Sequence, residues 1–145
     1  MASNQDIQLA TDLRTVVTRL VKKLRKESVT GQQLSLTERS TMALLHQHKC
    51  LLPSELASME KITNQSMSQV LNYLHSLGYI SRTASDTDKR KVLVSLTDLG
   101  EQTITQMRRE RDKWLLKAIK ESCTDEEVVL LKQAIGPLTK LVDFE

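Results

Sequence analysis

The amino-acid sequence predicts a mainly α-helical fold that carries one short β-hairpin. Leu, Lys, Glu, Gln and Arg are abundant, whereas the chain has only 4 glycines and 2 prolines, too few for the frequent turns of an all-β fold. In several long stretches apolar residues recur at three- and four-residue steps, which is the pattern of amphipathic helices. The length of 145 residues and the lack of a long linker predict a single domain.

Composition narrows the class of protein. Apolar residues make up 39% and charged residues 27% of the chain, which places the sequence outside the disordered class. The net charge of +3 permits nucleic-acid binding without requiring it. We expect a cytoplasmic protein without a membrane segment, because no apolar run approaches the roughly 20 residues of a membrane span and no signal peptide is recognisable. Cys50 and Cys123 form no CxxC motif, so reduced thiols are expected.

Three helices are predicted in the first part of the chain. A stripe of apolar residues predicts a long first helix over residues 7–24, with cations at its C-terminal end. Ser35 and Glu38 have the spacing of a capping box, which begins a second helix that ends between residues 46 and 50. A short third helix is predicted over residues 53–59, because proline suits the first turn of a helix.

The stretch 63–77 is the most informative part of the sequence. Its periodicity predicts a helix with an apolar stripe on one face and a polar stripe, free of charge, on the other. A solvated face would carry Glu and Lys, whereas neutral amides and hydroxyls are the groups that read base edges. The apolar stripe is Met67, Val70, Leu71, Leu74 and Leu77, and the polar stripe is Gln65, Ser68, Gln69 and Asn72. Gly78 is expected to end the helix in the left-handed conformation.

A β-hairpin is predicted after this helix. Residues 79–83 and 91–96 are short β-branched or alternating runs on either side of the polar loop 84–90. Thr97 is then expected to cap a long fifth helix that ends near Glu121.

A second capping box, at Thr124 and Glu127, predicts a sixth helix. The Gly136-Pro137 pair should kink or divide this helix. Apolar stripes on the first and last helices favour association with another chain, and the alternative is that the two helices pack on each other within a monomer.

The helices over 53–59 and 63–77 are joined by a turn of the length found in a helix-turn-helix. In that motif the second helix enters the major groove with its N-terminal residues leading. The hairpin tip that follows is cationic, and a long arginine there can enter the minor groove. The alternatives are an ordinary helical hairpin and a solvated charged turn.

Two stretches resemble the MarR family of bacterial and archaeal transcription regulators. The first is Asp88-x-Arg90, followed by five residues and Leu96-Thr97, and the second runs from Ser54-Glu55-Leu56-Ala57 to Gly78-Tyr79-Ile80-x-Arg82. The resemblance implies a homodimer with two winged helix-turn-helix units on a pseudo-palindromic operator in double-stranded DNA. It also implies repression that a small-molecule effector, here of unknown identity, releases. In one MarR-like domain, residues 1–34 and 120–145 would form dimerisation helices, 35–100 the winged helix-turn-helix and 98–121 a connecting helix.

The polar stripe and the resemblance together give the expected DNA-binding residues. Residues 63–69 and Asn72 would face the major groove and Arg90 the minor groove. Arg82 and Lys89 would lie near phosphates, and Asp88 would brace Arg90. The full set is Ser54, Thr63, Asn64, Gln65, Ser66, Ser68, Gln69, Asn72, Arg82, Asp88, Lys89 and Arg90.

Other chemistry is not expected. His46, His48 and Cys50 are ligand types for zinc or copper, but they share one face only in an extended chain, so no metal or cofactor is predicted. Both cysteines are expected to be buried and inert, because cysteine is usually a small buried residue. Peroxide sensing is not expected, because the first helix lacks the cysteine of the peroxide-sensing members of the resembled family.

Two other functional classes remain as alternatives to a DNA-binding regulator. The phosphate-binding and nucleophile motifs of common enzymes are absent, so an enzyme is not expected. One alternative is a helical protein-interaction module that binds an acidic partner, and the other is a thiol-based redox sensor without operator binding.

Overall fold

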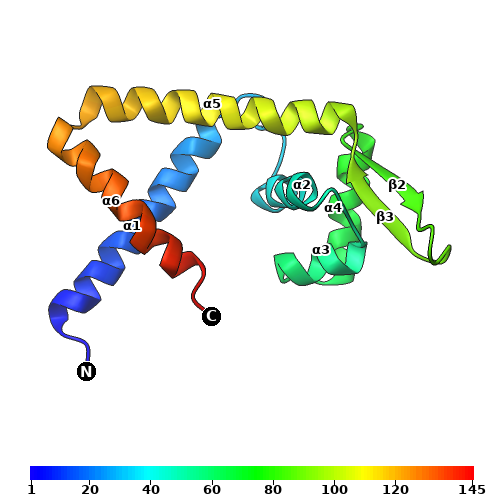
Figure 1. Ribbon diagram of the computed structural model, residues 1–145, viewed down its shortest axis with the longest axis horizontal. Coiled ribbons are helices and arrows are strands. Elements are labelled where there is room, and N and C mark those ends of the chain that lie inside the picture. The colour runs from blue at the N-terminus through cyan, green and yellow to red at the C-terminus, as the bar shows by residue number, and fades with distance from the viewer.

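The mainly helical fold predicted from the sequence is confirmed. A computed structural model describes residues 1–145. Helix α5 runs along the top of the molecule in Figure 1, with the hairpin and a cluster of three short helices near its N-terminal end. The elements are α1 (Asn4–Glu27), α2 (Leu36–His48), β1 (Cys50–Leu51), α3 (Pro53–Glu60), α4 (Asn64–Ser76), β2 (Ile80–Ala84), β3 (Val92–Leu96), α5 (Asp98–Ser122) and α6 (Asp125–Val142).

Side-chain caps explain where the helices begin. At the start of α2, Ser35 Oγ accepts a 3.1 Å hydrogen bond from Glu38 N, and Glu38 Oε1 accepts one of 2.9 Å from Ser35 N. The same reciprocal pair forms between Thr124 and Glu127 at α6, which confirms both predicted capping boxes. A third box, made by Ser3, begins α1 at Asn4 rather than at residue 7.

The hairpin of β2 and β3, called the wing below, is part of a three-stranded antiparallel sheet with the strand order β1-β3-β2. The predicted hairpin of β2 and β3 is confirmed, with Ile80 opposite Leu96 and Arg82 opposite Val94. Strand β1 was not predicted, because two residues are too few to show an alternating pattern. It pairs Leu51 with Val94 and so joins the turn after α2 to the wing.

The hydrophobic core lies within the winged unit and the first part of α5. The apolar stripe of α4 is central to this core, since Met67, Leu71 and Leu74 are at most 1% exposed. The other buried apolar residues come from the segment before α2, from α2, α3, the sheet and α5. They are Leu34, Met42, Leu45, Leu51, Leu56, Ala57, Tyr79, Ile80, Val94, Ile104 and Met107. This core fixes one face of α4 and leaves the other face in water.

The terminal helices contribute nothing to the core. Neither α1 nor α6 has a buried residue, and apolar side chains such as Val16 (58% exposed) and Ile135 (63%) face water. Helix α1 packs on α5, but the packing of α1 on α6 within one chain, which the sequence left open, is not formed. Helix α6 continues through Pro137 as one element, so of the kink or division expected there the division is wrong, and the kink stays a prediction. No helix combines the length and apolar character needed to cross a membrane.

Candidate nucleic-acid interface

Helices α3 and α4 are joined by a tight turn of three residues. Lys61 has a left-handed backbone (φ 55°), and the amide of Ile62 donates to the carbonyl of Ala57 at 3.0 Å. Thr63 then caps α4, with its Oγ1 accepting from Ser66 N at 3.0 Å and donating to Ser66 Oγ at 3.0 Å. The local sequence therefore builds a helix-turn-helix whose second helix begins at the molecular surface.

The polar stripe of α4 is exposed along its whole length. Gln65, Ser68 and Gln69 point away from the core and have no hydrogen-bond partner within the chain, so their donors and acceptors are free. Asn64 is exposed in the first turn of α4, and Ser54 is exposed in the first turn of α3. The sequence prediction that this edge faces outward is confirmed, and contact of these residues with bases stays a prediction.

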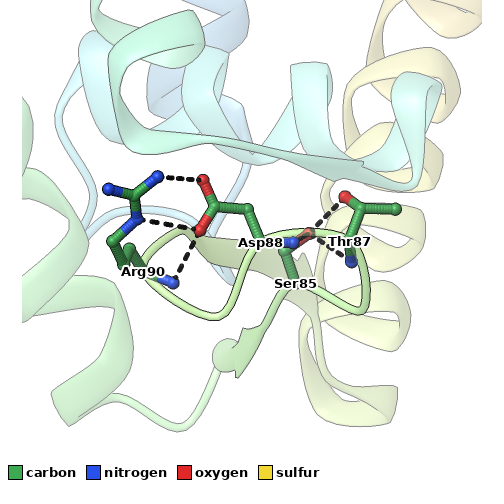
Figure 2. A network of polar contacts seen from close by, with 4 residues as sticks. All are labelled: Ser85, Thr87, Asp88 and Arg90. Carbon is green, nitrogen blue, oxygen red and sulfur yellow. Dashed lines mark hydrogen bonds and ion pairs between the residues drawn. The ribbon is translucent and has the colours of Figure 1, made fainter.

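A network of polar contacts shapes the wing tip (Figure 2). Ser85 Oγ accepts from the backbone amides of Thr87 (3.3 Å) and Asp88 (3.4 Å), which closes the turn. Asp88 Oδ1 accepts from Arg90 N at 3.1 Å and pairs with Arg90 Nε at 3.2 Å. The Arg90 side chain is 91% exposed and that of Asp88 only 29%. Asp88 thus holds the guanidinium itself, because Arg90 Nη2 also donates to Asp88 Oδ2 at 3.5 Å, while most of the arginine side chain stays exposed to solvent.

Two further cations lie next to Arg90 in the chain. Lys89 and Lys91 are exposed, and the backbone of Lys91 accepts from Ser85 N at 2.9 Å, which joins the two sides of the loop. The wing therefore presents three adjacent cationic side chains beside α4, as the sequence predicts. The exposed ion pair contributes little to stability, so the main effect of Asp88 is on the direction of Arg90.

Arg82 and Asn72 contact each other, which the sequence did not predict. Arg82 Nη2 on β2 donates to Asn72 Oδ1 on α4 at 2.9 Å. The sequence placed Asn72 toward bases and Arg82 toward phosphates, each as an independent side chain. Ten residues separate the two, and only the packing of β2 beside α4 brings them together.

A second unpredicted feature is the attachment of α4 to the segment that connects α1 and α2. Tyr73 Oη donates to the carbonyl of Gln33 at 3.0 Å, and Gln33 Nε2 donates to Tyr79 Oη at 2.9 Å. The same segment is bound to α5, where Glu110 accepts from Ser28 Oγ (3.2 Å) and from the Thr30 amide (3.2 Å). The segment between α1 and α2 thus links α5 to α4.

A pocket of about 380 Å³ lies between α1, α2 and α5. Buried Arg39 donates to the carbonyl of Gly31, and Arg25 Nη2 donates to the carbonyl of Leu34 at 3.3 Å. Burial, together with the charges of Arg25 and Arg111, lowers the pKa of Arg39 from its ordinary value. The lining is Val21, Leu24, Arg25, Leu36, Arg39, Ser40, Ala43, Ile104, Met107, Arg108 and Arg111, so four arginines face an otherwise mostly apolar space.

The other candidate groups do not come together. His46 and His48 lie in α2 and Cys50 in β1, so the extended arrangement with three ligands on one face is not formed. His46 Nδ1 instead contacts Glu101 Oε2 at 2.6 Å, and no cluster of three His, Cys, Asp or Glu side chains is placed to hold a metal ion. The expectation that both cysteines are buried is wrong, because Cys50 is exposed and Cys123 only partly covered.

Comparisons with known proteins agree with this geometry. The sequence model described as the MarR family matches residues 34–92. A Mycobacterium bovis protein named an HTH-type transcriptional regulator is 30% identical over 97% of this chain and 96% of its own. A Pseudomonas aeruginosa protein described as a transcriptional regulator has a structure that matches with a TM-score of 0.82 and 32% identity, over 99% of this chain and 100% of its own.

A third match concerns the fold alone. A MarR mutant from Escherichia coli, solved with operator DNA, superimposes with a TM-score of 0.66 at 21% identity, over 93% of this chain and 96% of its own. The exposed polar edge of α4, the adjacent wing and these matches over nearly the whole chain all lead to one conclusion: this chain belongs to the MarR family.

Proposed function

We propose that the protein is a sequence-specific, DNA-binding transcription repressor that acts in the cytoplasm as a homodimer on a pseudo-palindromic operator. The observation that carries this proposal is the uncharged, exposed edge of α4 beside a wing with three exposed cations. Neutral amides and hydroxyls distinguish base edges, whereas cations bind phosphate without regard to sequence. The strand β2 that leads to these cations adjoins the polar edge, because Arg82 contacts Asn72 of α4.

Each part of the surface has its own role in this proposal. Gln65, Ser68 and Gln69 contact base edges in the major groove, led by the N-terminus of α4. The positive end of the helix dipole and the exposed Asn64 lie near a phosphate. Arg90, whose guanidinium Asp88 orients, enters the minor groove, and Lys89 binds the adjacent DNA backbone.

The terminal helices support assembly with a second copy. Helices α1 and α6 bury no residue in the isolated chain, yet each carries a run of exposed apolar side chains. A helix needs tertiary contacts to be stable in water, so these faces call for a partner. A second copy related by a two-fold axis supplies the same faces and sets two α4 helices on two half-sites of one operator.

The arginine pocket is the proposed effector site. Four arginines around an apolar space suit a small amphipathic anion, since charge-assisted hydrogen bonds hold its charged end and the apolar lining its body. Arg25 and Arg39 now donate to carbonyls of the segment that also carries Gln33. An anion that competes for these guanidinium groups would loosen the segment that holds Tyr73 of α4.

Selection from random duplex DNA tests the proposed function. We expect the wild-type protein to enrich a pseudo-palindrome, and fluorescence anisotropy to show affinity that falls steeply with salt. Gln69→Ala should weaken binding of the selected duplex by about 1 to 3 kcal/mol, whereas Gln102→Ala, an exposed amide on α5, should not. If no sequence is enriched, the proposal is refuted. That result would favour the protein-interaction module, whose acidic partner would compete with DNA for the wing.

The effector proposal has a matched pair of probes. Benzoate is expected to raise the thermal unfolding temperature and weaken duplex binding, whereas neutral benzamide, of nearly the same shape, should do neither. Arg111→Met should reduce the response to benzoate. Equal responses to benzoate and benzamide would exclude an anion site. Loss of duplex binding with the thiol oxidant diamide alone would instead favour the redox alternative through exposed Cys50.

A further inference from the structure

The contact between Arg82 and Asn72 is the one side-chain hydrogen bond that joins the recognition helix α4 to strand β2. Arg82 Nη2 lies 2.9 Å from Asn72 Oδ1, and both residues are exposed. The contact lies at the edge of the surface proposed to meet DNA, and neither residue helps to hold the core. A bond in this position can affect recognition without being needed for folding.

The chemistry of arginine fixes the orientation of the asparagine amide. A guanidinium group has hydrogen-bond donors only, so the atom of Asn72 that faces it must be the oxygen. If the amide of Asn72 were reversed, its NH₂ group would face the donors of Arg82, and the hydrogen bond between the two residues would be lost. The oxygen of Asn72 is therefore turned toward β2, and its NH₂ group lies on the other side of the amide.

We propose that Arg82 is a positioning residue that selects the base read by Asn72, an inference that rests on the proposed DNA-binding function. With its oxygen held by Arg82, Asn72 presents donors. It then favours guanine, with acceptors at O6 and N7, or thymine, with its acceptor at O4. Cytosine, which presents a donor in the major groove, is disfavoured. Adenine is also disfavoured, since its bidentate contact needs the amide oxygen and nitrogen together at the base edge.

The other amides of the polar edge provide the contrast within the same helix. Gln65 and Gln69 have no hydrogen-bond partner in the chain, so either can turn its amide to suit the base that it meets. Asn72 differs because its acceptor is already engaged. The structure thus combines two adaptable amides with one amide of fixed polarity.

The test is a comparison of base preferences among variants of the full-length protein, selected on the same randomised duplex library. The base pair that Asn72 contacts is identified as the position whose preference is lost in Asn72→Ala. At that position Arg82→Gln should reduce the preference for guanine or thymine roughly fivefold, the effect of one hydrogen bond, because glutamine can donate to or accept from the amide. Arg82→Lys should keep the preference, since lysine also has donors only.

Two controls separate positioning from a loss of charge. Lys89→Gln removes a wing cation without touching Asn72, and should weaken binding to all sequences while leaving the base preference unchanged. In the Asn72→Ala background, Arg82→Gln should change no base preference at all. Circular dichroism should show all variants folded, because both side chains are exposed.

The outcomes distinguish this inference from the function on which it rests. Loss of the preference in Arg82→Gln, its retention in Arg82→Lys and no further change in the double variant would support positioning by Arg82. An unchanged preference in Arg82→Gln, or the same change with Asn72 absent, would overturn the inference and leave the DNA-binding function intact. If the wild-type protein enriches no sequence, the proposed function itself fails and this inference with it.

Discussion

Gly100, in the first turn of α5, is the position where one added methyl group should be most disruptive. A Cβ atom there would lie 2.1 Å from the carbonyl oxygen of Tyr79 and 3.2 Å from Leu96 Cδ2. The obstacle at 2.1 Å is backbone, which cannot turn aside as a side chain can. Two hydrogen bonds join the segments that meet at this point. Thr97 N donates to Tyr79 O at 3.0 Å, and Thr97 Oγ1 donates to Gly78 O at 2.6 Å.

The magnitude of the Gly100→Ala effect follows from this geometry. Relief of the clash needs a shift of about 1 Å, which weakens at least one of these bonds. Overpacking costs about 1 to 3 kcal/mol and a lost hydrogen bond about 1 kcal/mol. The better helix propensity of alanine returns somewhat less than 1 kcal/mol. We therefore expect the free energy of unfolding to fall by about 1 to 3 kcal/mol.

Gly78→Ala is the matched comparison for this prediction. Gly78 has a positive φ of 79°, but its added Cβ would meet only Leu99 Cδ2 at an ordinary 3.6 Å. The cost is backbone strain alone, about 1 to 2 kcal/mol. Urea unfolding followed by far-UV circular dichroism, at one protomer concentration, would compare the two variants. A smaller loss for Gly100→Ala than for Gly78→Ala would refute the reasoning from close backbone approach.

Three further predictions concern the wing, the dimer and the segment between α1 and α2. Arg90→Ala should weaken binding of the selected duplex by about 1 to 3 kcal/mol, and titrations at several salt concentrations should show the salt slope reduced by about 1; an unchanged affinity would exclude the wing role. Ile135→Glu on α6 should give folded monomers in analytical ultracentrifugation, whereas Gln133→Glu should leave dimers; dimers of both would contradict the proposed interface. Burial opposes ionisation of Glu110, but hydrogen bonds from Thr30, Gln106 and Ser28 together outweigh it and lower its pKa from 4.5. Its contribution to stability is therefore present above pH 4.5 and lost as the pH falls through the lower folded value, so the advantage of wild type over Glu110→Gln in urea unfolding should shrink in that range; a constant difference would contradict this account.

The elements that could be predicted from sequence are those whose determinants are local. The caps at Ser35 and Thr124 are made within one turn, and the two faces of α4 follow from its periodicity. The contact at the hairpin tip could also be predicted from the sequence, because Asp88 and Arg90 are two residues apart. In each case the residues that decide the structure lie next to one another in the chain.

The features that could not be predicted depend on tertiary packing. Strand β1 forms only because β3 offers an edge, and its two residues have no pattern of their own. The bond from Arg82 to Asn72 and the contacts of Gln33 with Tyr73 and Tyr79 join residues separated by 10 to 46 positions. Helix α6 continues through Pro137 although proline has a local cost inside a helix, and no buried contact of α6 in the single chain explains this.

The surface of α4 shows how a recognition helix can be both rigid and available. Its buried side, with Met67, Leu71 and Leu74, packs in the core and fixes the position of the helix. Thr63, one of the residues expected to face the major groove, supplies the N-cap and is therefore partly engaged in holding the helix start. The free amides begin directly after it, at Asn64 and Gln65. A side chain with a partner in the folded chain keeps fewer groups for bases, so Gln65 and Gln69 can adapt to the base that they meet whereas Asn72 offers only its NH₂ group.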